Sequence, residues 1–162
     1  MKVVSNTGPL IGLAKVNQLS LLKSMYREVL IPPMVHKELM GKVGMESDQI
    51  DSALQDFINV KELKTLEPAT ESALADLDEG EKQAIALAAT VKKDVLLLLD
   101  DRAGREAAKK LNVPTTGLIG ILLLAKEKGL IKNVKSLLDE IRNHGYWLSD
   151  EVIEVARKLA GE

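Results

Sequence analysis

The chain has 162 residues, of which 46% are hydrophobic and 28% are charged, as in a folded domain. With 22 basic and 24 acidic side chains, its formal net charge is −2, so any nucleic-acid site must be a local basic patch. The absence of cysteine excludes disulfides, thiol chemistry and zinc–thiolate sites. We see no secretion signal and no apolar segment long enough to cross a bilayer. We therefore expect a single domain over residues 1–162, a cytoplasmic location and no membrane association.

The first half of the chain alternates between predicted strands and predicted helices. Short apolar segments bounded by turn residues favour strands, and helical spacing of apolar residues favours helices. Pro9 and Pro33 suit the first turns of two of these helices. Strands are expected at 2–5, 28–31 and 58–63, and helices at 9–14, 19–25, 33–39 and 49–57.

The second half continues the same alternation. Residues 66–77 predict a loop leading into a short helix. A strand is expected at 96–99, a short edge strand or turn at 113–116, and helices at 82–91, 102–111, 117–128, 134–143 and 149–159. Strands separated by helices are typical of an α/β fold with a parallel sheet.

The most informative segment is the run of four leucines at 96–99, which two aspartates follow at once. An uninterrupted apolar run of this length predicts a strand that is buried on both faces of a parallel sheet. Asp100 and Asp101 would then lie at the carboxyl edge of the sheet, where open α/β sheets bind their ligands.

Three further polar groups are expected near the same edge. Asn6 follows the first strand, while Glu38 and Glu81 lie near the starts of helices. Strand ends and the helix starts that follow them share one edge in a parallel sheet. Clustered carboxylates raise one another's pKa, and a hard divalent cation such as Mg²⁺ or Mn²⁺ relieves this conflict. A bound ion of this kind can also activate water.

Each of these residues also has a purely structural interpretation. Asp78 and Glu81 have the spacing of a capping box, and taken alone this is the better interpretation. Asp100 and Asp101 could act as a helix cap and a dipole-favoured acid. Glu38 alone would be a solvated helix residue, and Asn6 alone a turn former. Only the convergence of all of them favours a site.

The helix after the two aspartates carries the cations that could guide a phosphate backbone, although they could equally form a solvated helix face. They are Arg102, Arg105, Lys109 and Lys110. Aromatic residues are few, whereas a base-stacking surface normally needs several. We therefore expect any nucleic acid to be held by phosphate contacts, and Tyr146 and Trp147 to pack the last helix against the domain.

Five segments in order resemble the PIN domain, and most closely the PIN-like toxin nucleases of prokaryotic toxin–antitoxin pairs. They are VVSNTGPLI, IPPMVHKEL, LDEGEKQAIALA, LLLLDDRAGREAAKKLNV and TTGLIGILLLAKEKGLI, and they span nearly the whole chain. The resemblance implies a three-layer α/β/α sandwich with a short central parallel sheet. It also implies a metal-dependent ribonuclease that is usually a homodimer.

The resemblance assigns the residues of the site by position. The catalytic set is Asn6, Glu38, Glu81, Asp100 and the close alternative Asp101, and Asn6, Glu81, Asp100 and Asp101 would bind Mg²⁺ or Mn²⁺. Thr7 takes the place of a supporting hydroxyl, and it is grouped with Arg102 and Arg105 as an RNA-binding residue. The family normally has Asp where this chain has Asn6, and an amide brings no charge and cannot act as a base.

Three functions remain open at this point. The first is an Mg²⁺- or Mn²⁺-dependent endoribonuclease with activity weakened by Asn6, and the resemblance implies that it is a toxin paired with an antitoxin protein. The second is a non-catalytic PIN-like module that binds RNA or protein. The third and weakest is another Mg²⁺-dependent phosphoryl hydrolase. No P-loop, GxGxxG turn or Ser–His–Asp pattern supports a kinase or a serine hydrolase.

Overall fold

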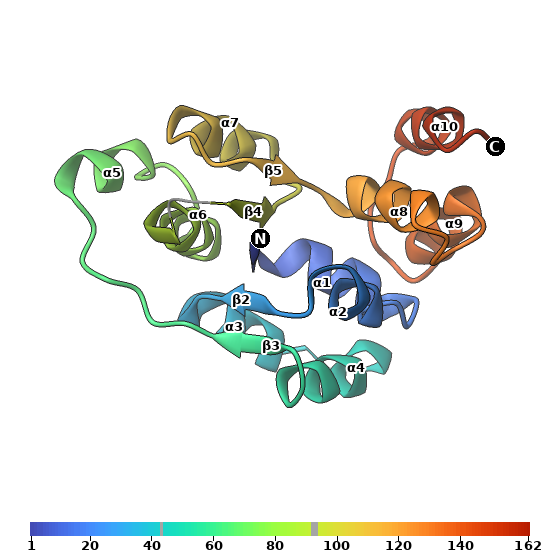
Figure 1. Ribbon diagram of the computed structural model, residues 1–162, viewed down its shortest axis with the longest axis horizontal. Helices are drawn as coiled ribbons and strands as arrows, with labels where there is room; N and C mark the ends of the chain where they lie inside the picture. Colours follow the sequence, from blue (N-terminus) through green and yellow to red (C-terminus); the bar gives the residue numbers. More distant parts are fainter. Residues whose placement is uncertain (43, 92–93) are drawn as a thin grey trace.

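A computed structural model describes residues 1–42, 44–91 and 94–162 of the chain. Its centre is a parallel sheet in the order β3-β2-β1-β4-β5, which Figure 1 shows. The strands of the described residues are β1 (Lys2–Ser5), β2 (Val29–Ile31), β3 (Ile58–Val60), β4 (Val95–Leu98) and β5 (Thr115–Thr116). This short parallel sheet confirms the predicted α/β fold.

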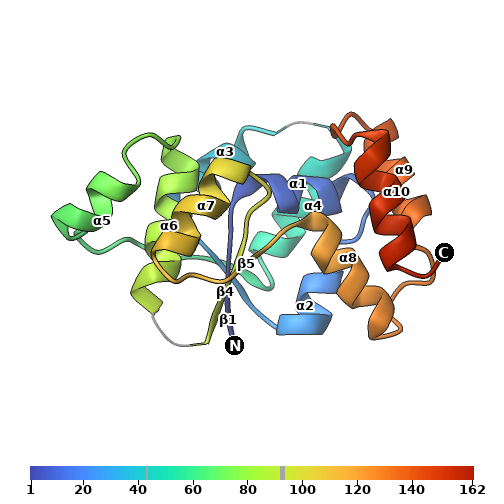
Figure 2. The same ribbon diagram turned by 90° about the horizontal axis from the view of Figure 1, so that it is seen from above.

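Helices cover both faces of the sheet and complete the three layers (Figures 1 and 2). On one face, α6 (Glu79–Val91) and α7 (Arg102–Lys110) pack over the strands, with α5 (Pro68–Ala73) beside them. The helices that share the other core are α1 (Thr7–Lys15), α2 (Ser20–Tyr26), α3 (Pro33–Met40), α4 (Met45–Leu54), α8 (Leu118–Glu127), α9 (Val134–Asn143) and α10 (Asp150–Leu159). The predicted three-layer sandwich is confirmed.

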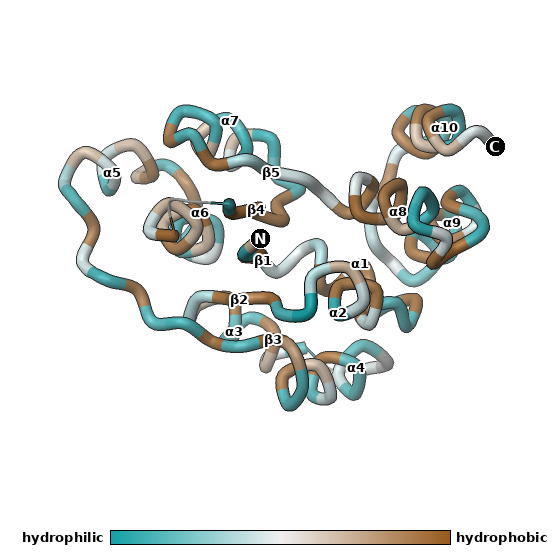
Figure 3. Tube along the Cα trace, viewed as in Figure 1, coloured by the Kyte–Doolittle hydropathy of each residue, from teal (hydrophilic) through white to brown (hydrophobic). Residues whose placement is uncertain are grey.

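The run of leucines is buried on both faces because successive side chains of a strand point to opposite sides. Leu97 and Leu99 belong to the core under α6, whereas Leu98 belongs to the core on the other face. All three are 0% exposed. The run is visible as the hydrophobic trace of β4 in Figure 3.

Most predicted elements differ from the structure by one to four residues at an end, and two of them show a physical reason. The helix expected at 49–57 begins earlier, at Met45, directly after Gly44, whose φ of 114° suits only glycine well. The strand expected at 58–63 ends at Val60, because β3 is an edge strand that pairs only with β2. These shifts do not move the polar residues at the carboxyl edge.

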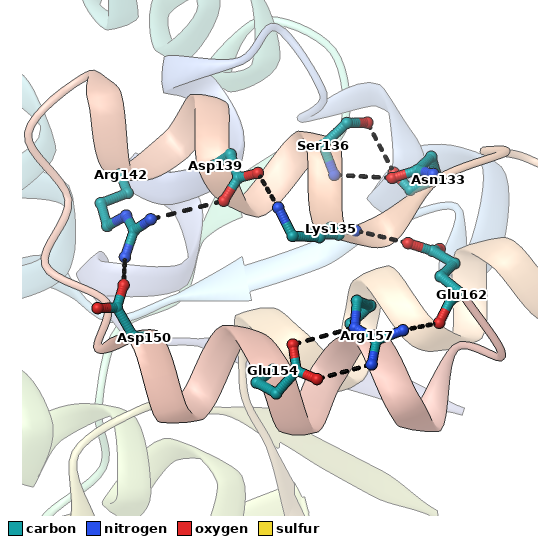
Figure 4. Close-up of polar contacts among 9 residues, drawn as sticks. All are labelled: Asn133, Lys135, Ser136, Asp139, Arg142, Asp150, Glu154, Arg157 and Glu162. Carbon is teal, nitrogen blue, oxygen red and sulfur yellow. Dashed lines mark hydrogen bonds and ion pairs between the residues drawn. The ribbon is translucent and has the colours of Figure 1, made fainter.

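The end of the chain is held by Glu162, whose side chain caps the start of α9 (Figure 4). Its carboxylate accepts hydrogen bonds from the backbone N–H groups of Val134 at 2.6 Å and Lys135 at 3.0 Å. Lys126 Nζ lies 2.9 Å from the same carboxylate. Burial alone would raise the pKa of Glu162, but the hydrogen bonds from Lys126, Lys135 and Val134 outweigh it and lower the pKa to about 2.

Within the described part of the chain, none of the helices has the length and apolar character needed to cross a membrane.

Candidate metal-binding and RNA-binding site

The polar groups after β1 and β4 lie next to each other because these two strands are neighbours in the sheet. Ser5 pairs with Leu98, and the backbone N–H of Asn6 donates to the carbonyl of Leu98 at 2.9 Å. The chain passes from β1 outward to β2 and β3, then returns to the other side of β1 as β4. Ligands in open α/β sheets bind at such a reversal of strand order.

Glu38 reaches this edge because α3 is fastened to α6. The side chain of Gln83 on α6 accepts a hydrogen bond from the backbone N–H of Met34 at 2.9 Å, which holds the start of α3. Glu38 and Asn6 then meet above Gly80. A Cβ at Gly80 would collide with Oε1 of Glu38 and lie 3.6 Å from Oδ1 of Asn6. The two side-chain oxygens therefore lie over Gly80, in space that a larger residue would fill.

The start of α6 brings Glu81 into the same group. Asp78 caps the helix, because its Oδ1 accepts a hydrogen bond from the backbone N–H of Glu81 at 2.8 Å. Burial and the adjacent Asp78 raise the pKa of Glu81 to about 7, and the charges of Asp101 and Glu38 add to this effect. Burial and then the charge of Asp78 also raise the pKa of Glu38. The cap that Asp78 forms, one half of the predicted capping box, is thus confirmed. The side chain of Glu81 lies among carboxylates.

The two aspartates after β4 point to different places. Asp101 begins α7, where its Oδ2 accepts a hydrogen bond from the backbone N–H of Gly104 at 2.7 Å, and its charge also acts on Glu81. Asp100 instead accepts hydrogen bonds from the backbone N–H of Leu118 at 2.9 Å and from the hydroxyl of Tyr146 at 2.7 Å. Asp101 therefore belongs to the acidic group of Glu38 and Glu81. Asp100 instead holds α8 and the segment before α10 in place through its two hydrogen bonds.

Burial raises the pKa of the Tyr146 phenol, and the negative charge of Asp100 and the hydrogen bond to it raise it further. This hydroxyl is therefore a donor throughout the physiological range. It holds Asp100 in place, and Tyr146 packs against the core as the sequence predicted. For Trp147 that prediction was wrong, because its side chain is 82% exposed.

The donor set at the edge suits a hard divalent cation. Thr7 is only 9% exposed, and its Oγ1 lies near enough to the Glu38 carboxylate to lower the pKa of Glu38, although it makes no hydrogen bond of ordinary geometry among the described residues. Across those residues, no three side chains of His, Cys, Asp or Glu are close enough together to hold a metal by themselves. An ion at this edge would therefore need the amide oxygen of Asn6 in addition to carboxylates from Glu38, Glu81 and Asp101. Such oxygens are what Mg²⁺ and Mn²⁺ bind.

The cations of α7 lie on the other side of Asp100. A cavity of about 570 Å³ is lined by Asp100, Arg102, Arg105 and Lys109 together with residues of the β5 segment. Arg102 is exposed and pairs with Glu106 at 3.6 Å, a weak surface interaction. Figure 3 shows α7 as a largely hydrophilic helix beside the hydrophobic β4. Glu106 lines the cavity too, so three cations and two carboxylates give it a small net positive charge.

Three contributions to the site were missed from the sequence. Asp78 was interpreted only as a cap, although its charge acts on Glu38 and Glu81. Gly80 carried a recognisable signal, since a glycine between two acids in the first turn of a helix is costly unless space is needed there. The bond of Tyr146 to Asp100 joins residues 46 positions apart and has no local signal.

The fold and the site define an α/β protein with an acidic, oxygen-rich edge flanked by cations. Residues 2–162 match a family described as the PIN domain. The chain belongs to the PIN-domain family, which generally includes metal-dependent nucleases.

The structure is similar to that of a PilT N-terminus domain protein from the hyperthermophilic archaeon Sulfolobus solfataricus P2. The TM-score is 0.56 and the sequence identity 22%, over 75% of this chain and 90% of the archaeal chain. At this identity the likeness supports the fold alone. No curated protein matches the chain.

Proposed function

We propose that this protein is a metal-dependent endoribonuclease. The observation that supports the proposal best is the convergence of Asn6, Glu38, Glu81 and Asp101 at the carboxyl ends of β1 and β4. Carboxylates gathered in this way repel one another, and evolution tolerates this cost mostly at functional sites. Membership of the PIN-domain family supports the same chemistry.

Glu81, Asp101 and Asn6 would hold Mg²⁺ or Mn²⁺, with Glu38 beside them and Asp100 as an outer support. When bound, the ion supplies Lewis-acid polarisation of the phosphoryl group and activation of water. Glu81, whose pKa is raised to about 7, can accept or release a proton near neutral pH, and burial raises the pKa of Glu38 as well. Asn6 contributes an oxygen without a charge, which weakens the attraction for the cation.

Arg102 and Arg105 on α7 would bind the phosphates of RNA that enters the acidic edge. Guanidinium groups suit this purpose because they pair with phosphate in a planar, bidentate way. A toxin role with an antitoxin partner, and a homodimer, remain expectations from the family resemblance. A catalytically silent RNA-binding or protein-binding module is the second candidate, and the uncharged Asn6 is the observation that favours it.

The decisive experiment is RNA cleavage with Mg²⁺ or Mn²⁺ by four proteins: the chain itself, Asn6→Asp, Glu81→Gln and Glu79→Gln. Glu79→Gln is the matched control, because Glu79 lies in the same helical turn and bonds only to Gln83 among the described residues. We expect cleavage that Asn6→Asp increases, that Glu81→Gln abolishes and that Glu79→Gln leaves unchanged.

Cleavage only by Asn6→Asp would favour the silent module. Absence of cleavage by all four proteins, with no metal binding in calorimetry, would show that the acids serve only as caps and surface groups.

A further inference from the structure

We propose that Trp147 stacks on a base of single-stranded RNA, in a pocket that Asp100 and Arg105 also line. The proposal rests on the ribonuclease function proposed above and adds a stacking contact by which the RNA substrate is bound. The sequence led us to expect phosphate contacts without stacking, because aromatic residues are scarce. The structure places one of these few aromatics where a base could reach it.

The pocket has a volume of about 290 Å³, and aromatic, aliphatic and charged side chains line it. Trp147 and Tyr146 supply aromatic surface, Leu118 and Ile119 of α8 supply apolar surface, and Arg105 of α7 supplies a positive charge. Trp147 is 82% exposed and shares the pocket with the exposed Val152, and grouped apolar surface of this kind marks an interaction site. The indole therefore does not serve the packing of the domain.

The pocket adjoins the cavity along α7 through two shared residues. Asp100 lines it and also lines the 570 Å³ cavity along α7, and so does Arg105. The next residue after Asp100 is Asp101, which belongs to the acidic group. A nucleotide whose base rests on Trp147 would thus have a neighbouring phosphate beside Arg105 and the cavity along α7.

The charges favour RNA over a protein side chain as the occupant. Arg105 has no carboxylate within ion-pair distance among the residues that the structure describes, so its guanidinium is available to a phosphate. The adjoining cavity adds Arg102 and Lys109. An aromatic surface next to cations is the usual composition of a single-strand binding site. Stacking also tolerates any base, so no sequence preference follows.

The test uses the intrinsic fluorescence of Trp147, which is the only tryptophan of the chain. Short single-stranded RNA is titrated into the Glu81→Gln protein in EDTA, which keeps the RNA intact, while anisotropy of labelled RNA measures binding independently. We expect saturable quenching by the single strand and little quenching by an RNA duplex, whose bases are already stacked and paired.

Two substitutions and two controls sharpen the result. Trp147→Ala should weaken single-strand binding roughly tenfold, and Trp147→Phe should recover most of the affinity, since stacking on one aromatic ring contributes about that much. Arg105→Ala should flatten the salt dependence of binding, whereas Lys110→Ala should not, because Lys110 is on the same helix but lines neither cavity. Circular dichroism checks that each variant is folded.

RNA that binds without changing the emission of Trp147, or that binds Trp147→Ala as tightly, would overturn the proposal. So would an emission that shifts with protein concentration alone, because a second copy of the chain would then cover the pocket. Glu81-dependent cleavage without quenching would overturn this inference and leave the ribonuclease intact. Quenching without cleavage would support the pocket and overturn only the ribonuclease.

Discussion

Replacing Gly80 by alanine should separate the chemistry of the acidic edge from the stability of the fold. The new Cβ would collide with Oε1 of Glu38, the far end of a flexible side chain, while its contact of 3.6 Å with Oδ1 of Asn6 is ordinary. Glu38 must therefore turn away from the edge. Turning to an unfavourable rotamer costs about 0.5–1.5 kcal/mol. Alanine in a helix regains about 1 kcal/mol relative to glycine.

The two effects nearly cancel, so the free energy of unfolding should change by no more than about 1 kcal/mol, or roughly 2–4 °C in Tm. Affinity for Mn²⁺ and RNA cleavage should fall by roughly tenfold or more, because a carboxylate at the ion is displaced. Thermal melting, calorimetry and a cleavage assay measure these quantities.

Gly120→Ala is the matched control, since its Cβ would collide with another side-chain oxygen, Oγ1 of Thr116, outside the acidic group. If Gly80→Ala binds metal and cleaves RNA like the original chain, then Glu38 has no part in the site. A loss of stability well above 1 kcal/mol would show that Glu38 cannot move, and that the reasoning about Gly80 is wrong.

Three further predictions test other parts of the structure. Asn6→Asp should lower Tm in the absence of metal, because it adds a negative charge beside Glu38. The same substitution should tighten Mn²⁺ binding about tenfold or more in calorimetry, because the new carboxylate attracts the cation. Equal Mn²⁺ binding by the two proteins would place the ion elsewhere. Tyr146→Phe should cost about 2 kcal/mol in urea unfolding, because it removes the 2.7 Å hydrogen bond to Asp100, and an unchanged midpoint would contradict this. Glu162→Gln tests a carboxylate whose pKa falls from 4.5 to about 2 on folding. Its stabilisation should be fully present above pH 4.5 and lost as the pH falls towards 2, and we expect about 1 kcal/mol after discounting for solvent screening. A Tm gap between the two proteins that persists at pH 2 would refute this assignment.

The order of strands and helices followed from local patterns in the sequence, and the structure confirms it. The leucines of 96–99 had to form a strand buried on both faces, because a four-residue apolar run has no polar side to show to water. The residues of the carboxyl edge followed too, since every parallel strand ends at the same edge whatever the order of the strands. This is why Asn6, Glu38, Glu81 and the pair Asp100 and Asp101 could be grouped from the sequence alone.

Only the tertiary structure decided how those residues divide their roles. Asp100 and Asp101 are adjacent and chemically identical, yet Asp100 is bound by Leu118, 18 residues later, and by Tyr146, 46 residues later. Long-range contacts of this kind leave no local pattern, so the sequence could not tell which aspartate faces Glu81. The exposure of Trp147 was equally hidden, because an aromatic residue before a helix cap packs inward or outward according to neighbours from other parts of the chain.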